Sequence, residues 1–260
     1  MGRPALATTV HDPDARLVPL LEARAAILRA EYGVACASVT SSTAEVTIRC
    51  LREAGIEPLS GGDAGIGASR RAAVAAVAAH SPSSILYCDM DRWLHWATAY
   101  PDELAGLPDR MLGKRGGAWY ACLGRTPRAL ATHPRVQVLC EDATNRAASS
   151  AFRRRSDVTA GAAWLSPDGA SAVLEGSVEA SNATDGEWPA IVWRKDPARV
   201  LQAWCEGLEF ETATFHAPEI AAGGGREAWE RQVYDTPEAW SARLALASAT
   251  AAALVRVLRA

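Results

Sequence analysis

The sequence predicts an α/β fold in which a mostly parallel central sheet is flanked by helices. Short apolar runs alternate with longer amphipathic stretches through residues 1–92, which is the pattern of strands that are connected by helices. The chain has 260 residues, of which 49% are hydrophobic, so it can bury one large core. We therefore expect a single domain over residues 1–260.

The elements of the first part follow from the same periodicity. We expect strands at 5–10, 34–40, 56–59 and 83–88, and helices at 14–32, 44–54 and 69–80. Gly33 and Gly55 each follow a predicted helix, where glycine commonly ends the helix in a left-handed conformation. This order of elements predicts a parallel sheet, and ligands of such sheets bind at the carboxyl ends of the strands.

Beyond Asp91 the apolar periodicity is mixed. We expect a helix or turn at 102–107, a strand at 118–123, and helices at 146–152, 170–180, 197–205 and from Pro237 onward. The glycines at 223–225 predict a flexible connector.

Charge and cysteine content limit the partners and the compartment. With 27 basic and 30 acidic residues, the chain lacks the broad basic surface of a protein that binds nucleic acid through phosphates. The six cysteines form no Cys-x-x-Cys pair, so we expect buried thiols in a reducing, cytoplasmic environment. No signal peptide precedes the first strand, and Arg243 and Arg256 interrupt the apolar C-terminal run. We therefore expect no transmembrane segment.

The segment Ile85-Leu-Tyr-Cys-Asp89-Met-Asp91 is the most informative part of the sequence. If the strand geometry extends to the end of this segment, period-2 alternation places the Asp89 and Asp91 carboxylates on one side of the sheet edge. Two close carboxylates repel unless a cation joins them, and Mg²⁺ and Mn²⁺ favour such oxygen ligands. The sequence thus predicts a divalent cation, Mg²⁺ or Mn²⁺, and the alternative is an acidic turn after a buried strand.

The loop Gly65-Ile-Gly-Ala-Ser-Arg-Arg71, together with the later Asp-Met-Asp, resembles the nucleotide-sugar-dependent glycosyltransferases of the GT-A fold. The resemblance implies that Arg70 or Arg71 approaches the donor diphosphate. It also implies that Asp89 contacts the donor ribose or the metal, and that Asp91 is a metal ligand.

Two further segments resemble the retaining group of that fold that makes mannosylglycerate and glucosyl-3-phosphoglycerate. Phe210-Glu-Thr-Ala-Thr-Phe-His216 offers the downstream histidine that completes the metal site in that group, and Ala183-Thr-Asp-Gly-Glu-Trp-Pro189 offers its acidic acceptor segment. The resemblance implies that His216 is a metal ligand and that Asp185 and Glu187 are catalytic residues facing the acceptor. The alternatives are a structural histidine and solvated loop acids.

The ends of the first two strands are expected to bind the donor nucleoside, through Thr9, Asp12 and Thr40. The arginines at 153–155 are candidates for binding an anionic acceptor, and the alternative is a solvated surface cluster.

Together these features predict a hexosyltransferase that moves a sugar from a nucleoside-diphosphate sugar to a small acceptor, with retention. Residues 1–92 would form the donor half, and residues 93–260 would form the acceptor half with a C-terminal helix. A sugar-phosphate nucleotidyltransferase is an alternative, although the expected glycine-rich loop with lysine is replaced by Thr9-Val-His-Asp-Pro-Asp14. A non-catalytic binding protein of the same fold is a second alternative, and a homodimer stays open.

Overall fold

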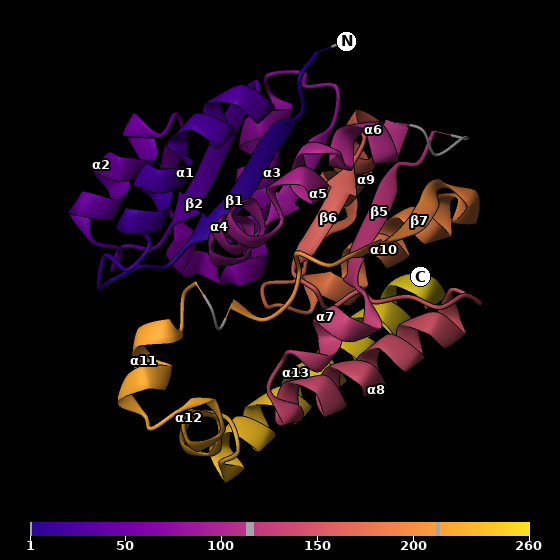
Figure 1. Ribbon diagram of the computed structural model, residues 1–260. Helices are drawn as coiled ribbons and strands as arrows, with labels where there is room; N and C mark the ends of the chain where they lie inside the picture. The colour runs from indigo at the N-terminus through magenta and orange to yellow at the C-terminus, as the bar shows by residue number, and fades with distance from the viewer. Residues whose placement is uncertain (1, 113–116, 212–213) are drawn as a thin grey trace.

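A seven-stranded sheet forms the centre of the molecule (Figure 1). The computed structural model describes residues 2–112, 117–211 and 214–260. The strands are β1 (Ala5–Val10), β2 (Val34–Val39), β3 (Glu57–Ser60), β4 (Ile85–Cys88), β5 (Tyr120–Arg125), β6 (Ala162–Leu165) and β7 (Val200–Cys205). Their order is β3-β2-β1-β4-β6-β5-β7, and β6 alone runs antiparallel to its two neighbours among the described strands. The expected mostly parallel sheet is confirmed.

Helices cover both faces of this sheet. One face carries α1 (Val18–Glu31), α2 (Glu45–Glu53), α4 (Met90–Ala99), α5 (Pro101–Ala105) and α6 (Leu107–Leu112). The other face carries α3 (Ile66–Ala78), α9 (Pro167–Gly176) and α10 (Thr184–Lys195). Successive residues of β4 alternate between the two cores, because Leu86 packs with the first set and Tyr87 with the second. The sheet is therefore buried on both sides, as parallel sheets usually are.

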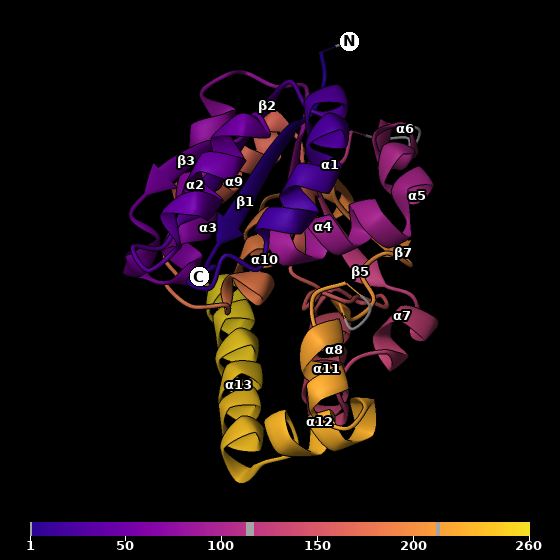
Figure 2. The same ribbon diagram turned by 60° about the vertical axis from the view of Figure 1, so that its left-hand side comes forward.

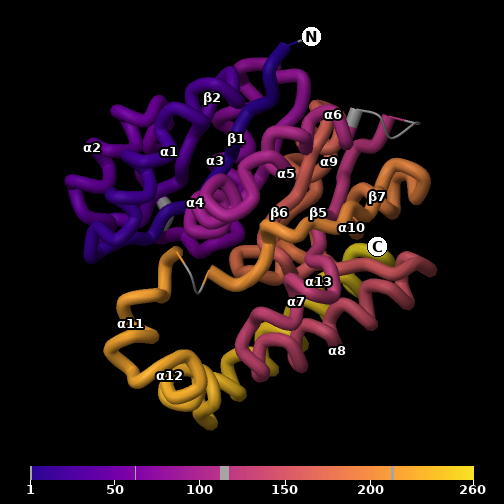
Figure 3. The backbone as a smooth tube through the Cα atoms, in the orientation of Figure 1, coloured from indigo at the N-terminus to yellow at the C-terminus, as the bar shows by residue number. Residues whose placement is uncertain are grey.

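A group of helices extends beyond the carboxyl ends of the strands (Figures 1 and 2). These are α8 (Arg135–Ala151), α11 (Ala217–Ala222), α12 (Arg226–Val233) and α13 (Pro237–Arg259), and the short α7 (Pro127–Ala131) precedes α8. The tube in Figure 3 shows the chain leaving β7, passing through α11 and α12, and returning along α13. The glycines at 223–225 make the turn between α11 and α12. This arrangement surrounds the edge of the sheet where ligands are expected.

Within the described part of the chain, α13 has the length and composition of a membrane-spanning helix. Its most apolar 18-residue window has a mean hydropathy of 1.4 and is 22% buried. However, Arg243 near its middle pairs with Glu141 of α8 at 3.4 Å, and Thr250 and Leu254 are buried. The helix therefore packs against the rest of the fold along one side, and alanine supplies much of its hydropathy.

Most predicted elements are confirmed within a few residues, but two expectations are wrong. The helix expected at 197–205 is a single 3-10 turn, η2 (Pro197–Arg199), followed by β7, which pairs in parallel with β5. A second 3-10 turn, η1 (Gly62–Ala64), precedes α3. The strand predicted at 83–88 is confirmed as β4, but the strand alternation expected to relate Asp89 and Asp91 is wrong, because α4 begins at Met90. All six cysteines are buried, and no disulfide joins them.

Candidate functional site

Two neighbouring pockets meet at the end of β4. The strand-end pocket has a volume of about 490 Å³ and is lined by residues that include Thr9, His11, Ile66 and Met90. The inner pocket has a volume of about 320 Å³ and is lined by residues that include Gln137, Glu141, Glu211, His216, Tyr234 and Arg243. Both pockets are lined by Asp89, Asp91, Arg92, Asn182 and Phe215. The acidic pair that the sequence singled out therefore lies in the wall between them.

The local structure of this acidic pair differs from the expectation. Asp89 is the N-cap of α4 and keeps extended backbone angles, with φ −58° and ψ 139°, while Asp91 lies in the first helical turn. Strand alternation therefore does not bring the carboxylates together, because the helix starts between them. The start of a helix suits negative charge through the helix dipole. Gly161 also matters here, because a Cβ at this position would lie 2.8 Å from the Asp89 carboxylate.

Asp89 is held by a full set of hydrogen bonds. Arg70 donates to its Oδ2 at 3.1 Å, Thr9 donates to its Oδ1 at 2.9 Å, and the Tyr87 hydroxyl also donates to Oδ1. Burial alone would raise the pKa of Asp89, but Arg70, the Tyr87 hydroxyl and Arg92 together lower it. Asp89 is thus an ionised carboxylate with a fixed orientation.

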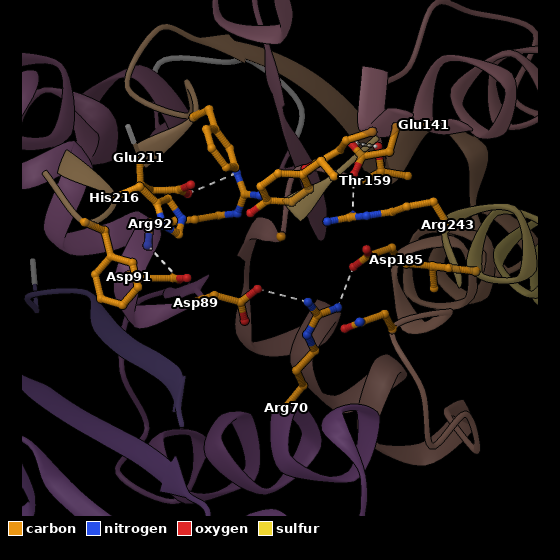
Figure 4. Close-up of a pocket in the computed structure, with 17 residues that line it drawn as sticks. Arg70, Asp89, Asp91, Arg92, Glu141, Thr159, Asp185, Glu211, His216 and Arg243 are labelled. Carbon is orange, nitrogen blue, oxygen red and sulfur yellow. Dashed lines mark hydrogen bonds and ion pairs between the residues drawn. The ribbon is translucent and has the colours of Figure 1, made fainter. Parts of the chain in front are cut away.

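Of the two candidate arginines, Arg70 is the one that lies in the site. Its guanidinium is buried between Asp89 and Asp185, and it donates to Asp185 Oδ1 at 2.5 Å (Figure 4). Arg71 instead donates to the Ser177 hydroxyl at 3.2 Å and to the Glu179 carbonyl. Arg71 therefore braces the segment before α10 and does not line either pocket.

Asp185 lines the inner pocket, as expected for a residue that faces the acceptor. It lies in the first turn of α10 and not in a loop. Burial raises the pKa of Asp185 to about 6, although Arg70 acts in the opposite direction, because that single cation is shared with Asp89. A carboxylate with this pKa is ionised at neutral pH and still basic enough to accept a proton.

The catalytic role expected for Glu187 is not supported by its position. Its side chain has 0% exposure and accepts hydrogen bonds from the Ser177 hydroxyl, the Val178 and Glu179 amides, and Arg256. These donors tie α10 to the preceding segment and to α13. Two residues after Asp185, a helical turn points the side chain to a different face, and Glu187 does not line either pocket.

Replacing Glu187 by alanine is expected to lower the free energy of unfolding by about 2–4 kcal/mol, because it leaves several buried donors without an acceptor. Urea denaturation measures this, and Glu175→Ala, at an exposed acid of α9, is the matched control and should stay within about 0.5 kcal/mol. Turnover of a nucleotide sugar per folded molecule should be unchanged. A loss of about 100-fold at full folding would restore Glu187 as a catalytic residue.

Asp91 lies among other carboxylates on the opposite side of the inner pocket from Asp185 (Figure 4). Burial raises the pKa of Asp91 to about 6, and the negative charges of Glu211 and Asp89 contribute to the increase. Glu211 pairs with Arg92 at 3.5 Å. Sequence reasoning did not single out Glu211 or Arg92, although both lie within segments that it quoted.

His216 lines the same pocket from the start of α11. Its ring stacks on Phe210 with the centroids 5.2 Å apart and also contacts Phe215 and Trp229. Burial lowers the pKa of His216, so the imidazole is neutral at pH 7, which is the form that ligates metals. The aromatic contacts fix the ring and also fit the structural alternative.

The donor set fits a divalent cation, although no metal centre is preassembled. Among the described residues, no three His, Cys, Asp or Glu side chains already stand at metal-ligand spacing. Asp91 nevertheless faces the negative charges of Glu211 and Asp89, which Arg92 offsets only in part, and Glu211 Oε1 is a buried oxygen without a hydrogen-bond partner. A cation beside these carboxylates would relieve both conditions. Asp91, Glu211 and His216 all line the inner pocket and are the residues that would hold the ion.

Of the three residues expected to bind the nucleoside, two lie at the strand-end pocket and one does not. Thr9 lines the strand-end pocket beside Asp89, and Thr40 bonds His11 Nδ1 of the same pocket at 3.0 Å. Asp12 is turned inward, because its carboxylate accepts from the Arg16 and Leu17 amides and from Thr47 at 2.7 Å. Asp12 therefore fixes the start of α1 and is not among the lining residues.

The basic run at 153–155 lies outside both pockets. Arg154 lies over the Trp193 ring at 4.7 Å, and Arg155 lies over the Trp204 ring at 4.5 Å. This position fits the alternative of a surface cluster, and Arg243 of α13 lines the inner pocket together with Arg70 and Arg92. Its position within the apolar C-terminal run was the available signal.

Comparison with known proteins relates the chain to others by structure and not by sequence. No known protein family and no curated protein is matched by the sequence. Solved structures of glucosyl-3-phosphoglycerate synthase from Mycobacterium tuberculosis are similar. The complex with UDP has a TM-score of 0.56 and 12% identity, over 95% of this chain and 80% of that chain. The complex with Mn²⁺, UDP and glucosyl-3-phosphoglycerate has a TM-score of 0.54 and 11% identity, over 78% and 70%. The chain has the GT-A fold, as expected.

Proposed function

We propose that the chain is a metal-dependent glycosyltransferase that moves a sugar from a nucleoside-diphosphate sugar to a small acceptor. The observation that carries this proposal is the position of Asp89 and Asp91 in the wall between two pockets, at the carboxyl edge of a GT-A sheet. The similar solved synthase binds UDP and Mn²⁺ in its complexes, which supports the same ligand classes here. We also propose a cytoplasmic location, which six buried cysteines without a disulfide support.

In this proposal the nucleoside binds in the strand-end pocket. The diphosphate then lies between the two pockets, beside Asp89 and Asp91. Asp91 and His216, with Glu211 beside them, would hold the cation. Such an ion, when bound, would stabilise negative charge on the leaving diphosphate. Arg92, which lines both pockets, adds a fixed positive charge to the same wall.

The transfer breaks the bond between the sugar C1 and the diphosphate oxygen, and the electron pair stays on that oxygen. A new bond forms from C1 to an acceptor hydroxyl, whose proton is released. Asp185 lines the inner pocket and has the basicity to orient that hydroxyl and take the proton at its carboxylate. We propose retention of anomeric configuration, and NMR of the first product formed tests this part.

Titration calorimetry with UDP and GDP, in EDTA, Mg²⁺ or Mn²⁺, tests the donor site. We expect one of the two diphosphates to bind at least about tenfold more tightly with either cation, because the carboxylates of Asp89 and Asp91 repel an uncompensated diphosphate. The corresponding monophosphate is the control and should show a smaller metal effect. Absence of binding under all three conditions contradicts the proposed function.

Assays on the same protein preparation distinguish the glycosyltransferase from the nucleotidyltransferase and from the non-catalytic binding protein. A glycosyltransferase should slowly hydrolyse its nucleotide sugar when no acceptor is present, and a panel of nucleotide sugars identifies the donor. Release of pyrophosphate from a nucleoside triphosphate and a sugar phosphate would instead support the nucleotidyltransferase. Metal-dependent diphosphate binding with no turnover of any donor would support the non-catalytic alternative.

A further inference from the structure

The far side of the inner pocket differs in chemistry from the side that faces the donor. It is formed by Gln137 and Glu141 of α8, Tyr234, and Arg243 and Leu246 of α13, none of which lines the strand-end pocket. Figure 4 shows the Glu141–Arg243 pair on the opposite side of the pocket from Asp91 and His216. A donor in the strand-end pocket would leave this side for the acceptor.

Negative charge outnumbers positive charge in the inner pocket. Its lining includes three arginines and five carboxylates. Arg70 pairs with Asp89 at 3.1 Å and with Asp185 at 2.5 Å. Arg92 pairs with Glu211 at 3.5 Å, and Arg243 pairs with Glu141 at 3.4 Å. A phosphate group would therefore have to separate one of these ion pairs and would add two charges to a negative pocket.

A divalent cation does not change this balance in favour of a phosphorylated acceptor. Five carboxylates against three arginines leave two negative charges, which one divalent cation would neutralise. The donor diphosphate brings further negative charge to the same wall. Repulsion between buried like charges is strong because the surroundings have a low effective dielectric constant. Arg243 is the arginine best placed to offset an acceptor charge, because its partner Glu141 is paired more closely with Arg125, at 2.5 Å, and one arginine does not balance the two charges of a phosphate group.

Among the described residues, two of the three buried polar atoms that lack a hydrogen-bond partner in this pocket are acceptors, and the third is the donor Arg70 Nε, on a guanidinium already paired with two carboxylates. Gln137 is 2% exposed, and its Oε1 is buried without a hydrogen bond. Glu211 Oε1 is also buried without a hydrogen bond. It forms an ion pair with Arg92 at 3.5 Å. Buried acceptors without donors cost free energy, which a ligand can recover by supplying O–H groups. Hydroxyl groups are therefore the chemistry that this pocket lacks.

We propose that the inner pocket takes a polyhydroxylated acceptor that carries no phosphate group and at most one negative charge. Gln137 Oε1 accepts from an acceptor hydroxyl, and Arg243 is the cation that faces a single carboxylate if the acceptor has one. This specificity differs from that of the similar solved synthase, whose complex contains glucosyl-3-phosphoglycerate. The inference rests on the proposed function, because it assigns the acceptor side of the same site.

Three hexoses with the same ring and different charge test the proposal. Glucose, glucuronate and glucose 6-phosphate are titrated into the protein saturated with Mn²⁺ and the nucleoside diphosphate that binds it, and 3-phosphoglycerate is included for comparison. We expect glucose and glucuronate to bind at least about tenfold more tightly than either phosphorylated compound, a difference of about 1.4 kcal/mol. Tighter binding of either phosphorylated compound overturns the proposal.

Failure of the acceptor assignment is distinguishable from failure of the proposed function. Metal-dependent binding of the diphosphate with no binding of any of the four acceptor probes also overturns the acceptor proposal, while the donor site stands. Loss of diphosphate binding itself would remove the proposed function instead.

A second variant tests the assignment of Gln137 without relying on the charge series. Gln137→Leu puts an apolar side chain of comparable volume in the place of the amide, so we expect the fold and the diphosphate affinity to be retained. The affinity for glucose should fall about tenfold. The control is Gln232→Leu, at an exposed glutamine of α12, which should change neither affinity. An unchanged glucose affinity in Gln137→Leu overturns the assignment.

Discussion

Replacing Asp91 by asparagine is expected to lower turnover of the donor sugar by about 10²–10³-fold and to remove the effect of Mn²⁺ on diphosphate binding. Asp91 is the carboxylate of the acidic pair that no arginine or lysine side chain holds by a hydrogen bond among the described residues, whereas Arg70 holds Asp89. Asparagine keeps the shape of the side chain but offers the cation no negative charge. Initial rates of nucleotide-sugar hydrolysis and calorimetry with and without Mn²⁺ measure the two effects.

The same variant should not be less stable at pH 7. Burial and the neighbouring carboxylates raise the folded-state pKa of Asp91 to about 6, above the value of 3.8 expected in the unfolded chain. The folded protein therefore holds an unfavourable charge at neutral pH, and a neutral side chain removes it. Activity should fall while the free energy of unfolding stays level or rises, as is common for residues that sacrifice stability for function.

Asp102→Asn provides the matched control, because Asp102 is an exposed aspartate of α5 outside both pockets. It should change neither the rate nor the metal effect. If Asp91→Asn retains wild-type metal-dependent binding, Asp91 is not a ligand of the ion, and the cation site must be sought at Glu211 and Asp89.

The strands and helices of the first half could be predicted because their signals are local. Apolar runs, glycine stops and amphipathic periods all arise within a few residues, and each agrees with the parallel sheet. β7 could not be predicted in this way. Val200–Cys205 becomes a strand because β5 offers it a hydrogen-bonding edge, and that edge is formed by residues about 80 positions earlier, such as Tyr120 opposite Val200.

In the candidate site, too, residues in local motifs could be predicted, and residues brought together by packing of distant segments could not. Asp89, Asp91 and His216 could be singled out because they fall in short motifs that resemble a known group. Glu187 shares such a motif with Asp185, and only the helical turn of α10 reveals that the two side chains face different surroundings. Gln137 and Arg243 carry no motif, and their proximity depends on α8 packing against α13. Sequence spacing cannot express a contact of that kind.

A buried ion-pair network beside the inner pocket holds the second half of the sheet to α8. Arg125, at the end of β5, is 1% exposed and donates to Asp157 Oδ1 at 2.8 Å and to Glu141 Oε2 at 2.5 Å. Asn145 donates to the same Asp157 carboxylate at 2.8 Å. Because Glu141 also lines the inner pocket, this network fixes one wall of the proposed acceptor site.

Arg125→Met is expected to lower the free energy of unfolding by about 3–5 kcal/mol, since it leaves the buried Asp157 without its cation and removes the closer of the two arginines that pair with Glu141. Urea denaturation measures the change, and Arg128→Met supplies the control. Arg128 is also paired with two glutamates, but its side chain is 50% exposed, so its loss should cost less than about 1 kcal/mol. A loss below 1 kcal/mol in Arg125→Met would mean that the network contributes little to stability.

The pH dependence of the free energy of unfolding tests whether Asp157 is the carboxylate that makes this network sensitive to acid. Burial would raise the pKa of Asp157, but the charge and hydrogen bonds of Arg125 outweigh it and lower the pKa from 3.8 to about 2. A lowered folded-state pKa gives stability that is present above pH 4 and lost as the pH falls toward 2, and this shift corresponds to roughly 2 kcal/mol. In Arg125→Met, the hydrogen bonds from Asn145 and from the backbone amide of residue 125 still oppose burial, but the guanidinium is lost, so the pKa of Asp157 should rise. Urea midpoints measured for both proteins between pH 2.5 and pH 5 should therefore fall less steeply with acid in Arg125→Met, and parallel shifts would assign the acid sensitivity to other carboxylates.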